Sequence, residues 1–280
     1  RKELHINNSL LMFHNRIKLF IFLIFFAVMT ACGIIEIEER DSAPTVPSDV
    51  SSVPDAVPKS EPRSRYGNPD SYIVFDKRYY VMSESGGFIE RGIASWYGKK
   101  FHGRRTSSGE TYDMYAMTAA HKTLPLPTYA EVINLENKKR IIVKVNDRGP
   151  FHENRIIDLS YTAATKLGIV ANGTGLVEVR AIDPNKYPGK GAPVRTVSLE
   201  KGGKGFFIQL GAFANLLNAE RLREKLGPIG DNLLRISQVI VEGETIYRVR
   251  IGPLFKIDDA DKIVTQLASL GVNNHHIVIN

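Results

Sequence analysis

The sequence has only one cysteine among its 280 residues, so no disulfide can form within the chain. It also lacks the short spacings typical of metal sites, because no two histidines stand one helical turn apart and no paired-cysteine knuckle occurs. Convergence of His102, His121 and His152 with a carboxylate is the remaining route to a metal, and no spacing favours it. Neither a phosphate-binding Gly-rich loop nor a serine nucleophile elbow is present. We therefore expect no metal and no cofactor.

Long apolar runs are missing except at residues 19–29, and that run is too short to favour a membrane-spanning helix. Arg16 and Lys18 precede it and small residues follow it, which is the pattern of an export signal. The chain begins with Arg1, so Met12 is a candidate for the true start.

The single cysteine, Cys32, comes directly after this apolar run. The sequence from Met29 to Cys32 resembles a bacterial lipobox, in which the thiol is lipidated, although Met29 replaces the more usual Leu. A leftover thiol is the ordinary alternative. Gly33 in place of Asp favours, by the same resemblance, the outer membrane over the inner one. We expect residues 1–32 to be a lipoprotein signal peptide and Cys32 to anchor the chain in the outer membrane, facing the periplasm.

Acidic residues are outnumbered, since 37 Lys and Arg against 30 Asp and Glu give a formal net charge of +7. Such a balance suits an anionic partner or an anionic surface. The basic residues are scattered, so a solvated surface explains them equally well.

Changes in composition divide the chain into two domains and two linkers. Residues 33–86 read as a Ser/Pro-rich tether, because residues 41–65 have almost no large apolar side chains to offset the entropy of ordering. Residues 87–183 form a first domain. Residues 184–204 are again rich in Gly, Pro and Lys and form a second linker, which leads into a second domain at residues 205–280.

The first domain combines many short strands with one short helix, which predicts a small β-barrel. The strands are expected at residues 88–97, 116–119, 129–135, 140–145 and 175–182. Asp158 is expected to cap a helix that runs to Leu167 and ends at Gly168.

The second domain has a βαββαβ order, which implies an antiparallel sheet with both helices on one face. The elements are expected at residues 206–211, 216–226, 235–241, 245–251, 259–270 and 276–279. Asp258 is the expected N-cap of the last helix.

Three side chains of the first domain are candidates for chemistry, namely Glu110, His121 and Asp147. Two carboxylates in one barrel provide the acid/base pair that glycosidic cleavage needs, provided that one of them stays protonated. Each also has an ordinary explanation, because Glu110 could be solvated in its loop and His121 could be a hydrogen-bonded, half-buried histidine. Trp96 and Tyr97 are candidate sugar-stacking faces, although aromatic rings in a barrel are more often core.

Five segments of this domain resemble the rare lipoprotein A family in residues, order and spacing. They are Ile93-Ala94-Ser95-Trp96-Tyr97-Gly98, Thr106-Ser107-Ser108-Gly109-Glu110, Met117-Thr118-Ala119-Ala120-His121, Val145-Asn146-Asp147-Arg148-Gly149-Pro150-Phe151 and Arg155-Ile156-Ile157-Asp158-Leu159-Ser160. The resemblance implies a double-psi β-barrel with lytic transglycosylase activity on peptidoglycan. It also implies that Asp147 and Glu110 are the essential carboxylates and His121 the essential histidine. Asn154 stands where the family usually has Gly, and Asn tolerates a left-handed backbone well.

The second domain resembles the sporulation-related (SPOR) repeat, a septal peptidoglycan-binding module with a ferredoxin-like fold. The resemblance lies in residues 206–213 and 247–253. Strand alternation places five side chains on the face that the helices leave open. They are Phe207, Gln209, Ile246, Arg248 and Arg250. The same layout would suit single-stranded RNA, but an exported protein does not meet RNA, so no nucleic acid is expected.

The resemblance implies cleavage of the bond between N-acetylmuramic acid and N-acetylglucosamine, with formation of 1,6-anhydro ends at the division septum. Asp147 would exchange the proton, Glu110 would stabilise positive charge, and His121 would orient a carboxylate or the substrate. Arg148 would steady Asp147 or bind a lactyl carboxylate. Sequence alone leaves the two carboxylate roles exchangeable.

Two other functions remain open, namely hydrolysis on the same barrel and non-catalytic wall binding as in expansins. The expected partners are peptide-free glycan strands, the membrane anchor through Cys32, and divisome proteins.

Overall fold

The computed structural model describes residues 41–45, 49–152, 154–187, 205–230 and 232–279. The expected signal peptide, Cys32 and most of the second linker lie outside these ranges. No helix within them is both long and apolar enough to cross a membrane.

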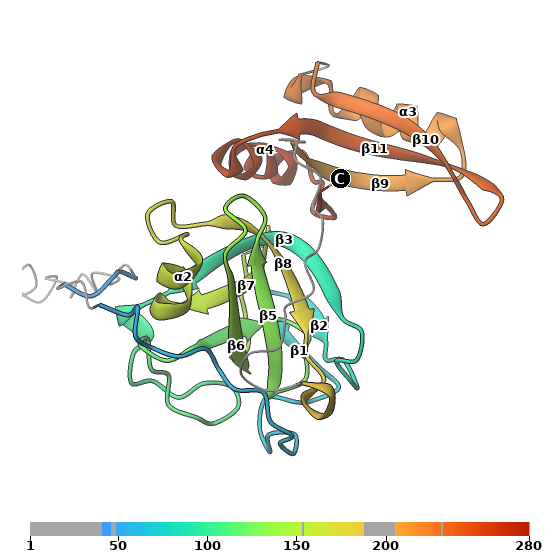
Figure 1. Cartoon of the computed structure of the whole chain (residues 1–280). Helices are drawn as coiled ribbons and strands as arrows, with labels where there is room; N and C mark the ends of the chain where they lie inside the picture. Colours follow the sequence, from blue (N-terminus) through green and yellow to red (C-terminus); the bar gives the residue numbers. More distant parts are fainter. Residues whose placement is uncertain (1–40, 46–48, 153, 188–204, 231, 280) are drawn as a thin grey trace, which may run out of the picture. The chain divides into compact units, whose positions relative to one another are not determined.

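Six strands of the first domain close into a barrel in the order β3-β7-β4-β6-β5-β8 (Figure 1). Their bounds are β3 Ile89–Tyr97, β4 Thr118–His121, β5 Thr128–Asn134, β6 Arg140–Asp147, β7 Arg155–Ser160 and β8 Gly175–Ala181. β3 pairs parallel with β7 and β4 parallel with β6, whereas the other neighbours are antiparallel. The predicted double-psi barrel is confirmed.

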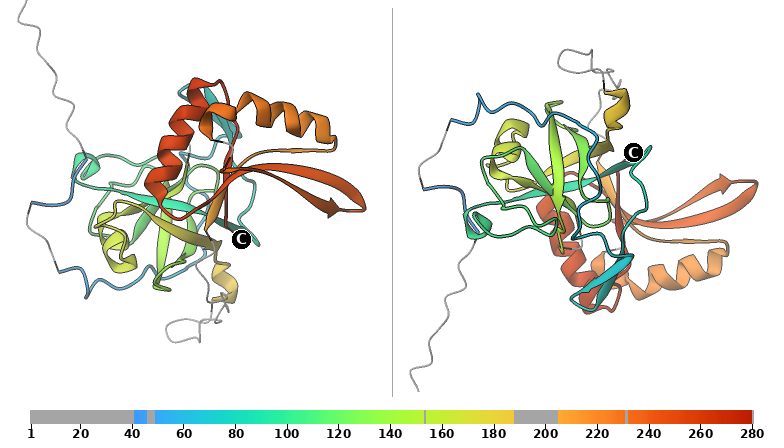
Figure 2. Two further views of the ribbon diagram at one scale, coloured as in Figure 1. Left: turned by 90° about the horizontal axis from the view of Figure 1, so that it is seen from above. Right: turned by 90° about the horizontal axis from the view of Figure 1, so that it is seen from below.

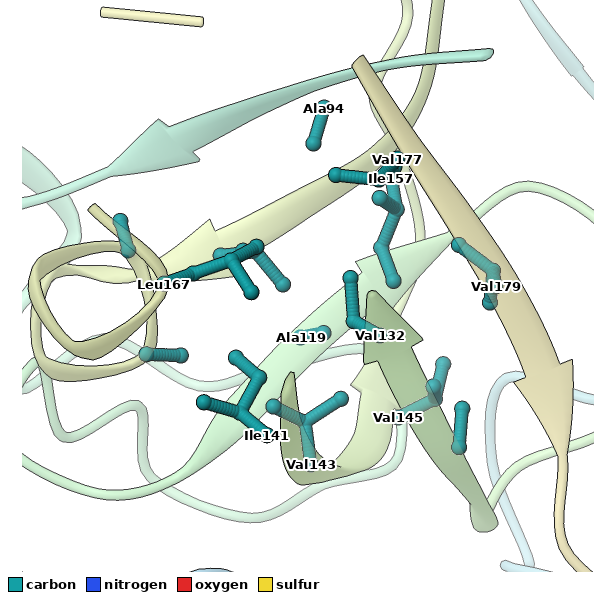
Figure 3. Close-up of a cluster of buried hydrophobic side chains, with 14 of the residues drawn as sticks. Ala94, Ala119, Val132, Ile141, Val143, Val145, Ile157, Leu167, Val177 and Val179 are labelled. Atoms are coloured by element: carbon teal, nitrogen blue, oxygen red, sulfur yellow. The ribbon is translucent and has the colours of Figure 1, made fainter. Parts of the chain in front are cut away.

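Apolar residues that alternate along the strands form the interior of the barrel. On β6, Ile141, Val143 and Val145 are at most 2% exposed, while the residues between them face outward or towards the loops. Alternate residues of the other strands, together with Leu167 of the short helix α2 (Tyr161–Leu167), fill the same interior (Figure 3). Burial of these side chains drives closure, since each contributes about 1.5–3 kcal/mol when fully buried.

The prediction that Asp158 caps the helix is wrong. Asp158 lies on β7, opposite Ser95 of β3, and the N-cap is Ser160, whose Oγ accepts a hydrogen bond from the N–H of Ala163 at 3.1 Å. The run 155–159 alternates between buried and half-buried side chains, so it pairs as a strand before the helix begins. Gly168 does end the helix, in a left-handed conformation with φ of 79°.

Much of the segment that was expected to be a tether packs on the barrel. The N–H of Ala56 donates to the carbonyl of Ile142 on β6 at 3.0 Å, and the N–H of Ser64 donates to the carbonyl of Leu126 at 2.8 Å. A hairpin of β1 (Ser71–Val74) and β2 (Lys77–Tyr80) follows. Backbone hydrogen bonds hold this segment on the barrel, and the amino-acid composition of the segment does not reveal them.

The second domain is a four-stranded antiparallel sheet in the order β10-β11-β9-β12. Its elements are β9 Phe206–Phe213, α3 Leu216–Lys225, β10 Leu234–Val241, β11 Glu244–Leu254, α4 Ile257–Ser269 and β12 His276–Ile279. Both helices lie on the same face of the sheet (Figure 2). Their apolar residues pack with those of the strands in one core. The predicted ferredoxin-like βαββαβ order is therefore confirmed.

The predicted N-cap of the last helix is wrong. The helix begins at Ile257, its N-cap is Lys256 without a side-chain hydrogen bond, and Asp258 lies within the first turn. There the carboxylate still interacts favourably with the helix dipole.

Candidate functional site

Asp147 lies at the end of β6, where a Ser-rich loop crosses the strand. Its Oδ1 accepts hydrogen bonds from the N–H of Ser107 at 2.8 Å, from the hydroxyl of Ser107 at 2.6 Å and from the N–H of Arg148 at 2.7 Å. The N–H of Ser108 donates to the carbonyl of Asn146 at 3.2 Å. These bonds join two segments that are about 40 residues apart in the chain.

β6 carries one extra residue, Asn146, in its pairing with β4, because Val145 and Asp147 pair with consecutive residues of β4. On a regular strand, neighbouring side chains face opposite sides. Here Asn146 and Asp147 both contact the same loop, through Glu110 and Ser107 respectively. The irregular register therefore gathers two polar side chains at one place, as β-bulges next to active sites commonly do.

Side chains of β6 bind both oxygens of the Glu110 carboxylate. Oε1 lies 2.7 Å from Nζ of Lys144, and Oε2 accepts a hydrogen bond from Nδ2 of Asn146 at 2.7 Å. Burial opposes the ionisation of Glu110, but the bonds from Asn146 and Lys144 outweigh it and hold the pKa of this carboxyl below its ordinary value. Glu110 is therefore a carboxylate at neutral pH.

The two carboxyl groups are held differently. All three donors to Asp147 meet Oδ1, and no residue in the described part of the chain donates to Oδ2. Glu110, in contrast, has both oxygens bound. A carboxyl group with a free oxygen can give and take a proton, whereas a carboxylate clamped by a cation and an amide can stabilise positive charge. The two carboxyl groups that the sequence left exchangeable therefore lie in different hydrogen-bond surroundings.

His121 contacts neither carboxylate of this pair through a hydrogen bond within the described ranges. Its ring is 2% exposed, Nδ1 accepts from the N–H groups of Thr123 at 3.2 Å and Leu124 at 3.0 Å, and Nε2 lies 3.4 Å from Oε2 of Glu90. Burial lowers its pKa against the opposing effect of Glu90, so the ring is neutral at pH 7. His121 thus shapes the chain that follows β4.

Arg148 uses its guanidinium inside the protein. Nε donates to the carbonyl of Gly67 at 2.9 Å, and one terminal nitrogen donates to the carbonyls of His121 at 3.1 Å and Leu124 at 2.6 Å. The other terminal nitrogen bonds to Oδ1 of Asn68 at 3.3 Å. Arg148 steadies Asp147 through its backbone N–H, and these internal bonds leave its guanidinium poorly placed for a lactyl carboxylate.

The two rings expected to stack on sugars are packing residues. Tyr97 is 8% exposed and stacks on Tyr112 with ring centroids 4.1 Å apart. Trp96 is half-buried, packs on the barrel core and meets Tyr161 edge-on at 6.0 Å. The burial of Tyr97 does not fit the expected role as a glycan platform, whereas the half-buried Trp96 stays a candidate.

Four polar residues of this site were not identified from the sequence: Ser107, Lys144, Asn146 and Glu61. The first three stand in or next to the recognised motifs, so adjacency was a usable signal. Asn146 is 2% exposed, and its Oδ1 has no hydrogen-bond partner among the described residues. Glu61 lies in the Ser/Pro-rich stretch, where nothing in the sequence marks it.

Metal ligation is the competing chemistry for these histidines and carboxylates. Within the residues described, no three His, Cys, Asp or Glu side chains lie close enough together to hold an ion.

The open sheet face of the second domain brings three of the five expected residues together. Nε of Arg250 donates to Oε1 of Gln209 at 2.9 Å, and its guanidinium lies 6.0 Å from the centre of the Phe207 ring. His276 of β12, which the sequence did not single out, pairs with Gln209 on its other side. Burial, with the nearby charge of Arg250, lowers the pKa of His276.

The other two residues lie further along the sheet. Arg248 pairs with Ala212, and Ile246 pairs with Val239 of β10. The register shift between Val249 and Arg250 places Arg250 opposite Gln209. The central strands are neighbours as expected, but Arg250 is the partner of Gln209.

Two family descriptions match the two domains. Residues 89–180 match the lytic transglycolase family of double-psi β-barrels, and residues 202–278 match the SPOR domain. Together they cover the barrel and the four-stranded sheet.

Relatives that span most of the chain have one description, endolytic peptidoglycan transglycosylase RlpA. The protein from Vibrio cholerae is 44% identical over 85% of this chain and 86% of its own length. The protein from Pseudomonas aeruginosa strain UCBPP-PA14 is 39% identical over 80% of each chain. A third, from Neisseria meningitidis serogroup A, is 50% identical over 71% of this chain and 79% of its own. The chain therefore belongs to the RlpA family.

Proposed function

We propose that this chain is an endolytic peptidoglycan lytic transglycosylase in which Asp147 is the acid/base and Glu110 the electrostatic stabiliser. The observation that carries this assignment is the clamping of Glu110. An ionised carboxylate with both oxygens bound cannot readily serve as an acid, whereas Asp147 keeps one oxygen without a described donor. Family membership supplies the reaction type.

In the first half of the reaction, protonated Asp147 donates its proton to the glycosidic oxygen while the bond from that oxygen to the muramyl anomeric carbon breaks. The electron pair of the bond goes to the leaving N-acetylglucosamine oxygen. Positive charge develops on the sugar, and the nearby Glu110 carboxylate stabilises it.

In the second half, the muramyl 6-hydroxyl attacks the anomeric carbon and gives its proton to Asp147. A 1,6-anhydro end forms, no water is consumed, and Asp147 is again protonated. Ser107 and the N–H of Arg148 hold the aspartate in place through both steps.

Mass spectrometry of products from peptide-free glycan strands tests the reaction class. Transglycosylase products are lighter by one water than hydrolytic ones, so reducing ends would instead establish a hydrolase. An absence of products, with retained binding, would leave an expansin-like wall protein.

Isosteric variants test the residue roles. Asp147→Asn and Glu110→Gln are each expected to abolish product release while circular dichroism stays unchanged. Glu136→Gln, in an exposed hairpin turn, is the matched control. Near-normal turnover of either site variant would contradict its role.

We also propose a finer placement of the protein in the cell envelope. The SPOR domain recruits the enzyme to peptide-free glycans at the septum, and Cys32 anchors it in the outer membrane. Support comes from the SPOR match and from the apolar run before Cys32. Incorporation of labelled palmitate that persists in Cys32→Ser would contradict the anchor.

A further inference from the structure

Glu61 reaches the candidate active site from the segment that precedes the barrel. Its Oε1 accepts a hydrogen bond from the hydroxyl of Tyr129 at 2.5 Å, and its Oε2 lies 3.2 Å from Nζ of Lys144. Tyr129 of β5 and Lys144 of β6 are directly opposed in the sheet, so their side chains project from the same face. Glu61 therefore spans one cross-strand pair and is 24% exposed.

The segment is held at both sides of Glu61. Ala56 bonds to the edge of β6 at 3.0 Å, and Ser64 bonds to the carbonyl of Leu126 at 2.8 Å. Between these two points, Glu61 lies over the strand pair and bonds to a residue of each strand. Glu61 lies outside the barrel residues 89–180 that match the family.

Lys144 connects Glu61 to Glu110. Its Nζ lies 2.7 Å from Oε1 of Glu110 as well as 3.2 Å from Glu61, and its side chain is 18% exposed. Three charges thus form one cluster, with two carboxylates sharing a single ammonium. The other cation near Glu61 is Lys59, at 3.6 Å and 68% exposed, so solvent screens it strongly. The cluster carries a net charge of about −1 beside Asp147.

This charge balance has a chemical consequence. A Lys144–Glu110 pair alone would be neutral and would do little for a cationic sugar. With Glu61 present, Lys144 is counterbalanced and Glu110 keeps its negative charge available.

We propose that Glu61 is a positioning residue for the transglycosylase reaction, which holds Lys144 and counterbalances its charge so that Glu110 can stabilise the oxocarbenium-like sugar. The inference rests on the proposed role of Glu110. It extends the catalytic unit from the barrel to the segment 56–68 in front of it.

Charge-neutral variants of the full-length protein test the proposal on peptide-free glycan strands. Glu61→Gln keeps the shape and the acceptor for Tyr129 and removes only the charge. We expect kcat to fall about tenfold with KM nearly unchanged. Without the repulsion from Glu61, the pKa of Glu110 falls further, so the acid limb of the pH–rate profile moves to lower pH.

A double variant that restores the charge balance gives the more specific test. Adding Lys144→Gln to Glu61→Gln leaves Glu110 as the single charge of the cluster, and kcat is expected to recover in part. Glu131→Gln neutralises a carboxylate on β5 that pairs with Arg140 at 3.5 Å. It is the matched control and should change neither kcat nor the acid limb of the pH–rate profile.

The possible outcomes distinguish a failure of this inference from a failure of the proposed function. If Glu110→Gln is inactive but Glu61→Gln has the parent's kcat and pH profile, Glu61 has no such role while the proposed function stands. If Glu61→Gln loses activity and the double variant loses more, Glu61 does not act by counterbalancing Lys144 and the inference is overturned. Normal activity of Glu110→Gln would remove the proposed function itself.

Discussion

The bond between Asn146 and Glu110 allows the ionised state of Glu110 to be measured without an activity assay. The perturbation is a double-mutant cycle of Asn146→Ala, Glu110→Ala and the pair, since a cycle isolates the coupling between two contacting residues. A hydrogen bond to a charged group contributes about 1.5–3 kcal/mol. The Glu110 side chain is 45% exposed, so solvent screening reduces the expected coupling to about 1 kcal/mol.

The sign of the pH dependence follows from the lowered pKa of Glu110. A carboxyl whose pKa is lower in the folded than in the unfolded state stabilises the fold above its ordinary pKa of 4.5. This contribution disappears as the pH falls through the lower, folded value. The coupling is therefore expected at pH 7 and should vanish at acid pH, when Glu110 is protonated in both states.

Urea unfolding of the four proteins at several pH values measures the coupling. Asn134→Ala is the matched control, because Asn134 is also 2% exposed but its amide donates to the neutral carbonyl of Leu167 at 3.2 Å. The unfolding free energy that Asn134→Ala loses should not depend on pH in this range. A coupling near zero at pH 7, or one that persists unchanged at acid pH, would refute an ionised Glu110 clamped by Asn146.

Three further predictions concern other parts of the chain. Tyr97→Ala should cost about 3–5 kcal/mol in unfolding free energy because it empties a buried stack, whereas unchanged melting with weaker glycan binding would restore its expected surface role. In full-length protein inactivated by Asp147→Asn, Arg250→Ala should weaken pull-down by peptide-free sacculi more than Arg248→Ala does, since Arg250 contacts Gln209 and Phe207; equal losses would contradict this. Burial raises the pKa of Asp158 to about 6 despite its bond from Ser95, so its stabilising effect is lost as the pH rises through that value. Asp158→Asn should therefore gain up to about 3 kcal/mol over the parent between pH 4 and pH 7, and parallel stability curves would contradict the raised pKa.

Local signals in the sequence predicted most of the architecture, although β7 was not expected as a strand. The alternation of Ile141, Val143 and Val145 predicted a strand, and the order of short strands and helices predicted both domains. These patterns are visible because burial on one side of a strand imposes a period of two on its own residues. The motifs around Glu110 and Asp147 likewise identified the two carboxylates, because their residue types and spacing are local properties.

Only the tertiary structure decided what surrounds each carboxylate. The clamp on Glu110 comes from side chains 34 and 36 residues further along the chain, which closure of the barrel and the extra residue in β6 bring to it. Glu61 is a second example, since its Ser/Pro-rich surroundings indicate a tether, whereas backbone and side-chain bonds to the barrel hold this segment in place. Tyr97 shows the reverse, because a ring that could stack on a sugar is buried against Tyr112 instead. Hydrogen bonds and ring contacts between distant residues leave no period in the sequence, so they become visible only once the chain is folded.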